Sequence, residues 1–156
     1  MSSKSGRRGA SDTGSLAALT LACTFAAALF GFGAGVLSLQ SAYEETGREA
    51  LIQLTRLVVY LALAVLLVYK GRWKGVAAAL VMILAATAIE WSLLPVSYAW
   101  ASLGDPAGYA EKIGGVERPT YIQWATFDVI GVGITAAFAQ GLRVIATANP
   151  ANKDDW

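Results

Sequence analysis

Three ionisable residues lie inside otherwise apolar stretches of the chain: Arg56, Glu90 and Asp128. A guanidinium and two carboxylates can form ion pairs, exchange protons or hold a cation. A lone charge deep in a membrane costs about 2.5–3.5 kcal/mol on insertion scales, and pairing with an opposite charge offsets that cost. We therefore expect Arg56 to pair with Glu90, with Asp128 or with both.

Helical spacing adds polar neighbours to these three residues, because positions three or four apart share one face of a helix. Tyr60 shares a face with Arg56, and Thr87 shares a face with Glu90. The predicted polar cluster therefore consists of Arg56, Glu90, Asp128, Tyr60 and Thr87.

Three interpretations of this cluster stay open. The simplest is an interhelical salt-bridge network that fixes helix packing, in which each polar contact contributes only about 0.6 kcal/mol. The second is a site for a proton, a cation or a polar head group, because two carboxylates face one guanidinium and an extra carboxylate in a low dielectric tends to hold a proton. The third is contact with a partner subunit.

The composition narrows the chemistry further. The sequence contains no histidine, which excludes His-ligated haem, His-based zinc sites and nucleophiles activated by histidine. Cys23 is the single cysteine, and it cannot form an internal disulfide. We find no catalytic constellation, metal-ligand spacing or phosphate-binding loop, so we expect no enzyme activity, metal or cofactor. The net charge of +1 gives no indication of a nucleic-acid partner.

The elements that position the cluster are long apolar segments. Of the 156 residues, 56% are hydrophobic and 15% are charged, against about a quarter charged in soluble domains. Mean hydropathy is +0.52. Four segments approach or exceed the ~20 residues that cross a bilayer, and the backbone must bond to itself in lipid, so each is predicted to be a helix. They span about 15–39, 47–69, 76–100 and 120–144.

Basic residues predict the orientation of these helices, because cytoplasmic loops are enriched in lysine and arginine. One side holds Lys4, Arg7, Arg8, Lys70, Arg72, Lys74, Arg143 and Lys153. The other holds only Arg48, Lys112 and Arg118, mixed with acidic residues. The fold class is thus an all-α integral membrane protein, an antiparallel four-helix transmembrane bundle with both termini cytoplasmic. The plasma (inner) membrane is the expected location.

Three regions follow from this organisation. Residues 1–14 form a disordered basic cytoplasmic tail, residues 15–144 the transmembrane domain, and residues 145–156 a short cytoplasmic tail. A cleavable signal peptide is the alternative for the first segment, although its apolar run is longer than a signal peptide needs. The loop over about 101–119 is rich in glycine and is either a binding surface or a connection.

Glycine spacing predicts where helices approach closely. Gly31 and Gly35 in the first segment form a small-residue motif, and Gly133, Ala137 and Gly141 form a similar one in the fourth. Packing within the bundle and docking on another protein both explain such motifs.

At 1.5 Å per residue, Arg56, Glu90 and Asp128 all lie roughly 9–12 Å below the outer interface. Our leading hypothesis is a non-enzymatic accessory or scaffolding subunit of a larger membrane complex. Its partners would be membrane lipids and other membrane subunits or copies of itself. The alternative is a small proton- or cation-coupled carrier or channel component that uses the cluster. A third interpretation is a membrane enzyme that acts on a lipid, with the carboxylates as acid and base.

Overall fold

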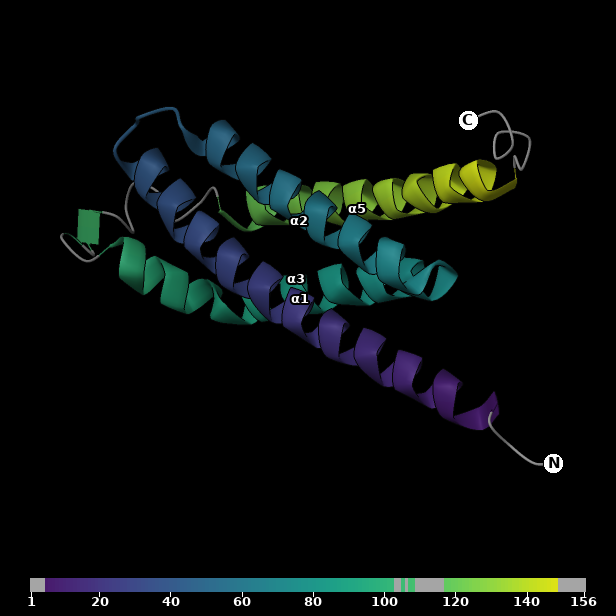
Figure 1. Ribbon diagram of the computed structural model, residues 1–156. Helices are drawn as coiled ribbons and strands as arrows, with labels where there is room; N and C mark the ends of the chain where they lie inside the picture. Colours follow the sequence, from purple (N-terminus) through teal and green to yellow (C-terminus); the bar gives the residue numbers. More distant parts are fainter. Residues whose placement is uncertain (1–4, 103–104, 106, 109–116, 149–156) are drawn as a thin grey trace.

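A computed structural model describes residues 5–102, 105, 107–108 and 117–148 of the chain. The regular structure in these residues is α-helical (Figure 1). The helices are α1 (Ser5–Tyr43), α2 (Glu49–Gly71), α3 (Trp73–Ala101) and α5 (Glu117–Ala148).

All four helices are long and apolar enough to cross a membrane. The apolar spans are Gly14–Tyr43, Glu49–Gly71, Trp73–Ala101 and Tyr121–Thr147. The shortest, α2, has 23 residues, so it is about 34 Å long and exceeds the ~30 Å hydrocarbon layer. These spans match the four segments predicted from the sequence, with ends that differ by a few residues.

The beginning of α1 differs from the sequence-based expectation. Helical backbone starts at Ser5 and therefore extends back into residues 1–14, which the sequence predicted as a disordered tail. Extending a helix that has already nucleated adds one hydrogen bond for each residue fixed. A polar segment next to a stable apolar helix can therefore continue that helix.

The central pair of the bundle is α2 and α3, and each of these helices contacts both α1 and α5. Small residues fill much of the interior, which lets the helix backbones approach closely. Fully buried examples are Ala27, Ala64, Ala79, Ala86 and Ala136. A few large side chains, such as Leu67, Met82 and Ile83, are also buried, but many lie on the outside, including Leu21, Phe25, Val58, Leu84, Ile134 and Phe138. Lipid tails are as apolar as these side chains, so this exterior suits a membrane.

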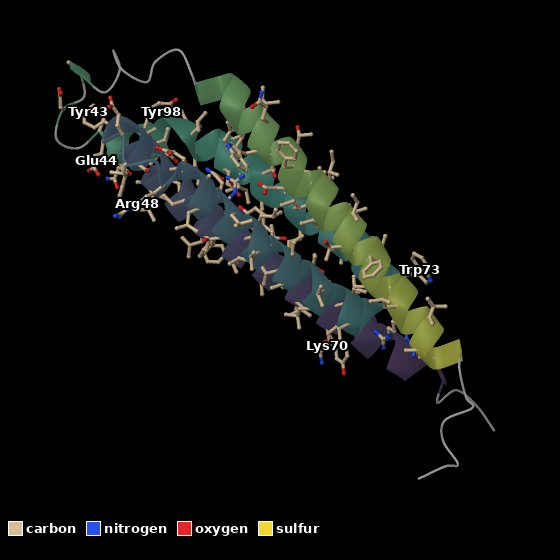
Figure 2. The ribbon with its side chains drawn as sticks, turned by 90° about the horizontal axis from the view of Figure 1, so that it is seen from above. Tyr43, Glu44, Arg48, Lys70, Trp73 and Tyr98 are labelled. Carbon is tan, nitrogen blue, oxygen red and sulfur yellow. The ribbon has the colours of Figure 1, made fainter. Side chains whose placement is uncertain are left out.

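The charged ends of the helices are separated by the length of the bundle. Figure 2 shows Lys70 and Trp73 at one end, and Tyr43, Glu44 and Arg48 at the other. The α2–α3 turn is tight: α2 ends at Gly71, α3 begins at Trp73, and Arg72 between them has a φ of 54°.

The start of α2 is held by polar contacts from α1 and not by a side-chain cap of its own. The residue before the helix is Arg48, which makes no side-chain cap. Ser41 of α1 supplies these polar contacts. Its hydroxyl donates to Glu49 Oε1 at 3.1 Å and accepts from the Arg48 N–H at 3.1 Å. The same hydroxyl lies 2.6 Å from the hydroxyl of Thr46. Gly47 has a φ of +68°, so the chain turns there and Thr46 cannot begin the helix.

A cation from α5 lies against the other end of α2. Arg143 donates from Nη1 to the carbonyl oxygen of Val68 at 3.3 Å and also bonds to that of Tyr69. Its guanidinium lies 5.5 Å from the centre of the Tyr69 ring. The Val68 carbonyl already accepts the Arg72 N–H at 2.9 Å, so Arg143 is a second donor there. The end of a helix carries partial negative charge, which the guanidinium of Arg143 offsets.

Candidate functional site: the buried polar cluster

Each of three neighbouring helices contributes a charged side chain to the polar cluster. Arg56 and Tyr60 lie four residues apart on the inner face of α2, Glu90 lies on α3 and Asp128 lies on α5. All four are buried, with exposed fractions of 2% for Arg56, 0% for Tyr60, 6% for Glu90 and 2% for Asp128. Charged residues are almost never this buried unless they are paired. The partners of each charged side chain therefore need to be identified.

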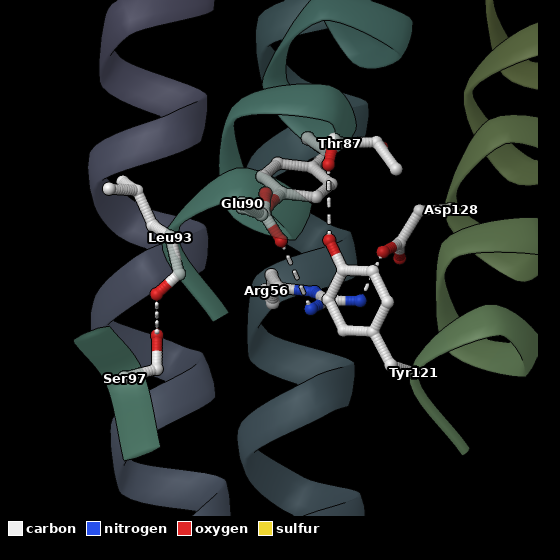
Figure 3. A network of polar contacts seen from close by, with 8 residues as sticks. Arg56, Thr87, Glu90, Leu93, Ser97, Tyr121 and Asp128 are labelled. Carbon is white, nitrogen blue, oxygen red and sulfur yellow. Dashed lines mark hydrogen bonds and ion pairs between the residues drawn. The ribbon is translucent and has the colours of Figure 1, made fainter. Parts of the chain in front are cut away.

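Arg56 joins the other two helices by binding both carboxylates (Figure 3). Its Nη1 donates to Oε2 of Glu90 at 3.5 Å, and its Nη2 makes a short ion pair with Oδ2 of Asp128. Asp128 is therefore the closer partner of the guanidinium. The structure thus places Arg56 in contact with both candidates that the sequence left open.

Glu90 has a second donor in Tyr60, whose hydroxyl makes a short hydrogen bond to Oε1. The Tyr60 ring also lies 5.7 Å from the guanidinium carbon of Arg56, within the range of a cation–π contact. One oxygen of Glu90 thus faces a cation and the other faces a neutral hydroxyl. Tyr60, which lies on the same helix as Arg56, therefore contacts both the Glu90 carboxylate and the Arg56 guanidinium.

Two polar atoms beside the ion pairs have no hydrogen-bond partner among the described residues. They are Nε of Arg56 and Oε1 of Gln53, one turn away on the same face of α2. Gln53 is 7% exposed, so bulk solvent does not satisfy its amide oxygen. Buried polar groups usually have a protein or water partner, so this donor and this acceptor are exceptions beside the ion pairs.

Thr87 takes part in the cluster through its backbone and not through the hydroxyl that drew attention in the sequence. Its carbonyl oxygen accepts a hydrogen bond from the Tyr121 hydroxyl at 3.2 Å (Figure 3). Tyr121 also contacts the ring of Trp91, with centroids 5.3 Å apart. Sequence reasoning did not include Tyr121 in the cluster. Its spacing of seven residues from Asp128, two helical turns on one face, was the available signal.

Gly31 of α1 closes the cluster on the fourth side. A Cβ atom built on Gly31 would collide with Oε1 of Glu90 and with the hydroxyl of Tyr60. Only a glycine therefore lets α1 approach the point where α2 and α3 are joined. The sequence identified Gly31 as a helix-packing residue, but it gave no indication that the surface packed against Gly31 is the Tyr60–Glu90 hydrogen bond.

The other predicted packing positions do not lie at close contacts. Open space surrounds the Cβ positions of Gly35 and Gly141, and Ala137 is exposed. Gly133 is in ordinary van der Waals contact, 3.6 Å from Cδ2 of Leu80. The small-residue stripe of α5 is thus not its packing seam.

The seam of α5 is the row of buried residues one position earlier in each turn. It consists of Asp128, Val132, Ala136 and Gln140. Because successive residues are rotated by about 100° around a helix, pointing Asp128 at Arg56 turns the glycine stripe to the side. A small-residue motif does not show which face of the helix points inward. A buried charge does, because it must point toward its partner.

As a chemical unit, the cluster combines one fixed cation with two carboxylates in a low-dielectric interior. Removing one partner of such an arrangement leaves an uncompensated buried charge and costs about 3–5 kcal/mol, so the cluster strongly disfavours other helix arrangements. Among the described residues, no group of three or more cysteine, aspartate and glutamate side chains lies close enough together to hold a metal ion.

Comparisons with known proteins add no identification. No protein-family model matches the chain, and the searches of curated proteins and of solved structures give no match.

Proposed function

We propose that this chain is a non-enzymatic integral membrane protein that acts as an accessory or scaffolding subunit of a larger membrane complex. Its four helices would run antiparallel across the plasma membrane, with both termini in the cytoplasm. The observation that supports this best is the use of the buried charges: Arg56 binds carboxylates from α3 and α5, and α1 seals the site at Gly31. A cluster closed on itself favours one rigid helix arrangement, which is what a scaffold needs.

The basic turn supports the orientation. Lys70 and Trp73 lie at one end of the bundle and Arg48 and Glu44 at the other (Figure 2). Lysine and arginine predominate at cytoplasmic ends, and the sequence places Lys70, Arg72 and Lys74 together in the α2–α3 turn.

Site-specific photocrosslinking in native membranes tests the scaffold proposal. A photoreactive residue is placed at successive positions along α1, starting from the exposed residues Leu21, Phe25 and Leu29. A subunit interface predicts one protein adduct of constant mass at positions that share a helix face. A chain that forms adducts only with lipid at every outward position, and that elutes as a monomer in mild detergent, would contradict the proposal.

A carrier or channel component that moves a proton or cation is the second candidate. Its support is the excess of carboxylates over guanidinium together with the unpartnered amide oxygen of Gln53. In reconstituted vesicles, this mechanism predicts a flux that is lost in Glu90→Gln and in Asp128→Asn while both variants stay folded. A flux that persists unchanged in both variants would rule it out.

A further inference from the structure

A groove lies between α3 and α5 on the outer surface of the bundle. Its volume is about 620 Å³, which is within the range of small-molecule sites. The α3 side includes Leu84, Thr87 and Trp91, and the α5 side includes Tyr121 and Ile130. All of these residues lie inside the apolar spans of the two helices, so in a membrane the groove opens at the depth of the lipid tails.

The two helices are bridged at the inner wall of the groove. The hydroxyl of Tyr121 reaches from α5 to the Thr87 carbonyl on α3, and the Tyr121 ring lies against Trp91. Both Thr87 and Tyr121 are half-buried, and Figure 3 shows them beside the Arg56 contacts. Tyr121 therefore lies between the groove and the buried charges.

Four hydroxyl-bearing residues line the groove, and three of these hydroxyls are bonded within the bundle. The Ser92 hydroxyl donates to the Ala88 carbonyl at 2.8 Å, and the Thr126 hydroxyl donates to the Ile122 carbonyl at 2.7 Å. With Tyr121 bonded to Thr87, these hydroxyl donors are all occupied within the bundle. A ligand in this groove would gain contact with apolar atoms and would find no free donor on these three side chains.

The shape of the groove favours a flexible chain over another helix. Leu84, Trp91, Ile122 and Ile130 line it and are exposed. Helices in membranes associate through small residues that let their backbones approach. Small residues such as Ala88, Ser92 and Ala125 also line the groove, but the four bulky, exposed side chains beside them would hold a second helix backbone away. A helix with its side chains is also about 10–12 Å across, whereas a hydrocarbon tail can bend between such side chains.

We propose that the α3–α5 groove is a binding site for one hydrocarbon tail of a membrane lipid, with Tyr121 as the wall that separates the tail from the Arg56–Asp128 ion pair. The site is independent of whether the chain acts as a scaffold or as a carrier. It would hold a lipid more tightly than the remaining apolar surface does.

Quenching of tryptophan fluorescence by lipids with brominated tails tests this proposal. Trp91 is kept as the only tryptophan by replacing Trp73, Trp100, Trp124 and Trp156 with phenylalanine. The matched control keeps only Trp100, an exposed residue of the same helix that does not line the groove. Brominated phosphatidylcholine is then titrated into the purified protein in detergent.

The expected result is saturable quenching of Trp91, half-maximal at a lipid concentration about tenfold lower than for Trp100. Filling the groove with Ala125→Phe or, from the other wall, Ala88→Phe should abolish this difference. Ala62→Phe, at an exposed position of α2 outside the groove, should preserve it.

Two outcomes would overturn the proposal. One is equal, non-saturating quenching of Trp91 and Trp100, which would show that lipids contact the groove only as they contact the rest of the surface. The other is a dimer that dissociates on Ala125→Phe substitution, which would show that a second copy of the chain fills the groove. The comparison of the two reporters decides the question even where a filling variant does not fold.

Discussion

At Arg56, one guanidinium compensates two buried carboxylates, so its removal should be the most damaging single change in the cluster. Arg56→Ala leaves both Glu90 and Asp128 without a cation, and breaking a buried pair in this way costs about 3–5 kcal/mol. We expect the free energy of unfolding, measured by denaturant titration in mixed micelles, to fall by about this amount.

Double variants show which carboxylate depends more on Arg56. Glu90 keeps the Tyr60 hydrogen bond when Arg56 is lost, whereas the Asp128 side chain binds only Arg56 among the described residues. Arg56→Ala with Asp128→Asn should therefore recover more stability than Arg56→Ala with Glu90→Gln. Equal recovery, or none, would contradict this account of the cluster.

Gly31 and Gly35 offer a matched pair on one helix. Alanine at Gly31 would collide with the oxygens of Glu90 and Tyr60, which are held by their own hydrogen bond, so we expect a loss of about 1–3 kcal/mol. Alanine at Gly35 meets open space and should be neutral or stabilising, because alanine favours a helix by up to about 1 kcal/mol over glycine. Unfolding titrations of the two variants compare them directly, and equal effects would refute the role assigned to Gly31.

Sequence reasoning identified those residues of the cluster whose charge is unfavourable in a membrane unless it is paired. Arg56, Glu90 and Asp128 could be grouped because an unpaired charge in an apolar segment is unfavourable wherever it lies. Tyr121 and Gly31 carry no such cost, and many tyrosines lie at interfaces while many glycines lie at helix contacts. Only the three-dimensional arrangement distinguishes the two residues that reach the cluster.

At the scale of the elements, the helices themselves were the most predictable feature. Twenty or more apolar residues must form a helix in lipid, so the four segments were evident from hydropathy alone. Their rotations and ends were not. The face of α5 that packs inward depends on the direction of Asp128, and the start of α2 depends on Ser41, which belongs to another helix.

Substitution of Arg143 tests whether its contacts hold α5 against the end of α2. The sequence counted it only as a cytoplasmic charge, but it bonds to the last carbonyls of α2 and lies against Tyr69. Arg143→Met should lower the free energy of unfolding by about 1–2 kcal/mol, through lost hydrogen bonds and the lost helix-end charge. Lys70→Met removes an exposed cation from the last turn of α2 and should change stability by less than about 0.5 kcal/mol. If the two substitutions have equal effects, general charge and not the contact is responsible.

At the scale of the whole molecule, three features together determine how the helices pack. They are the small buried residues, the large exposed residues and the single layer of buried charges. Apolar burial distinguishes little between helix arrangements in lipid, because the tails are as apolar as leucine. Specificity must then come from close backbone approach and from polar pairs. The bundle has both at one level, where Gly31 meets the Tyr60–Glu90 hydrogen bond beside the two ion pairs.

The orientation of this bundle can be tested with two cysteines at opposite ends. Cys23 is first replaced by alanine, which suits its buried, apolar position. Arg48 and Lys74, both exposed, are then each changed to cysteine in separate variants. Because basic residues predominate on the cytoplasmic side, a membrane-impermeant maleimide applied to intact cells should label the cysteine at position 48 and not the one at 74. Inverted membrane vesicles should give the reverse pattern, and labelling of position 74 in intact cells would show that the protein is oriented the other way.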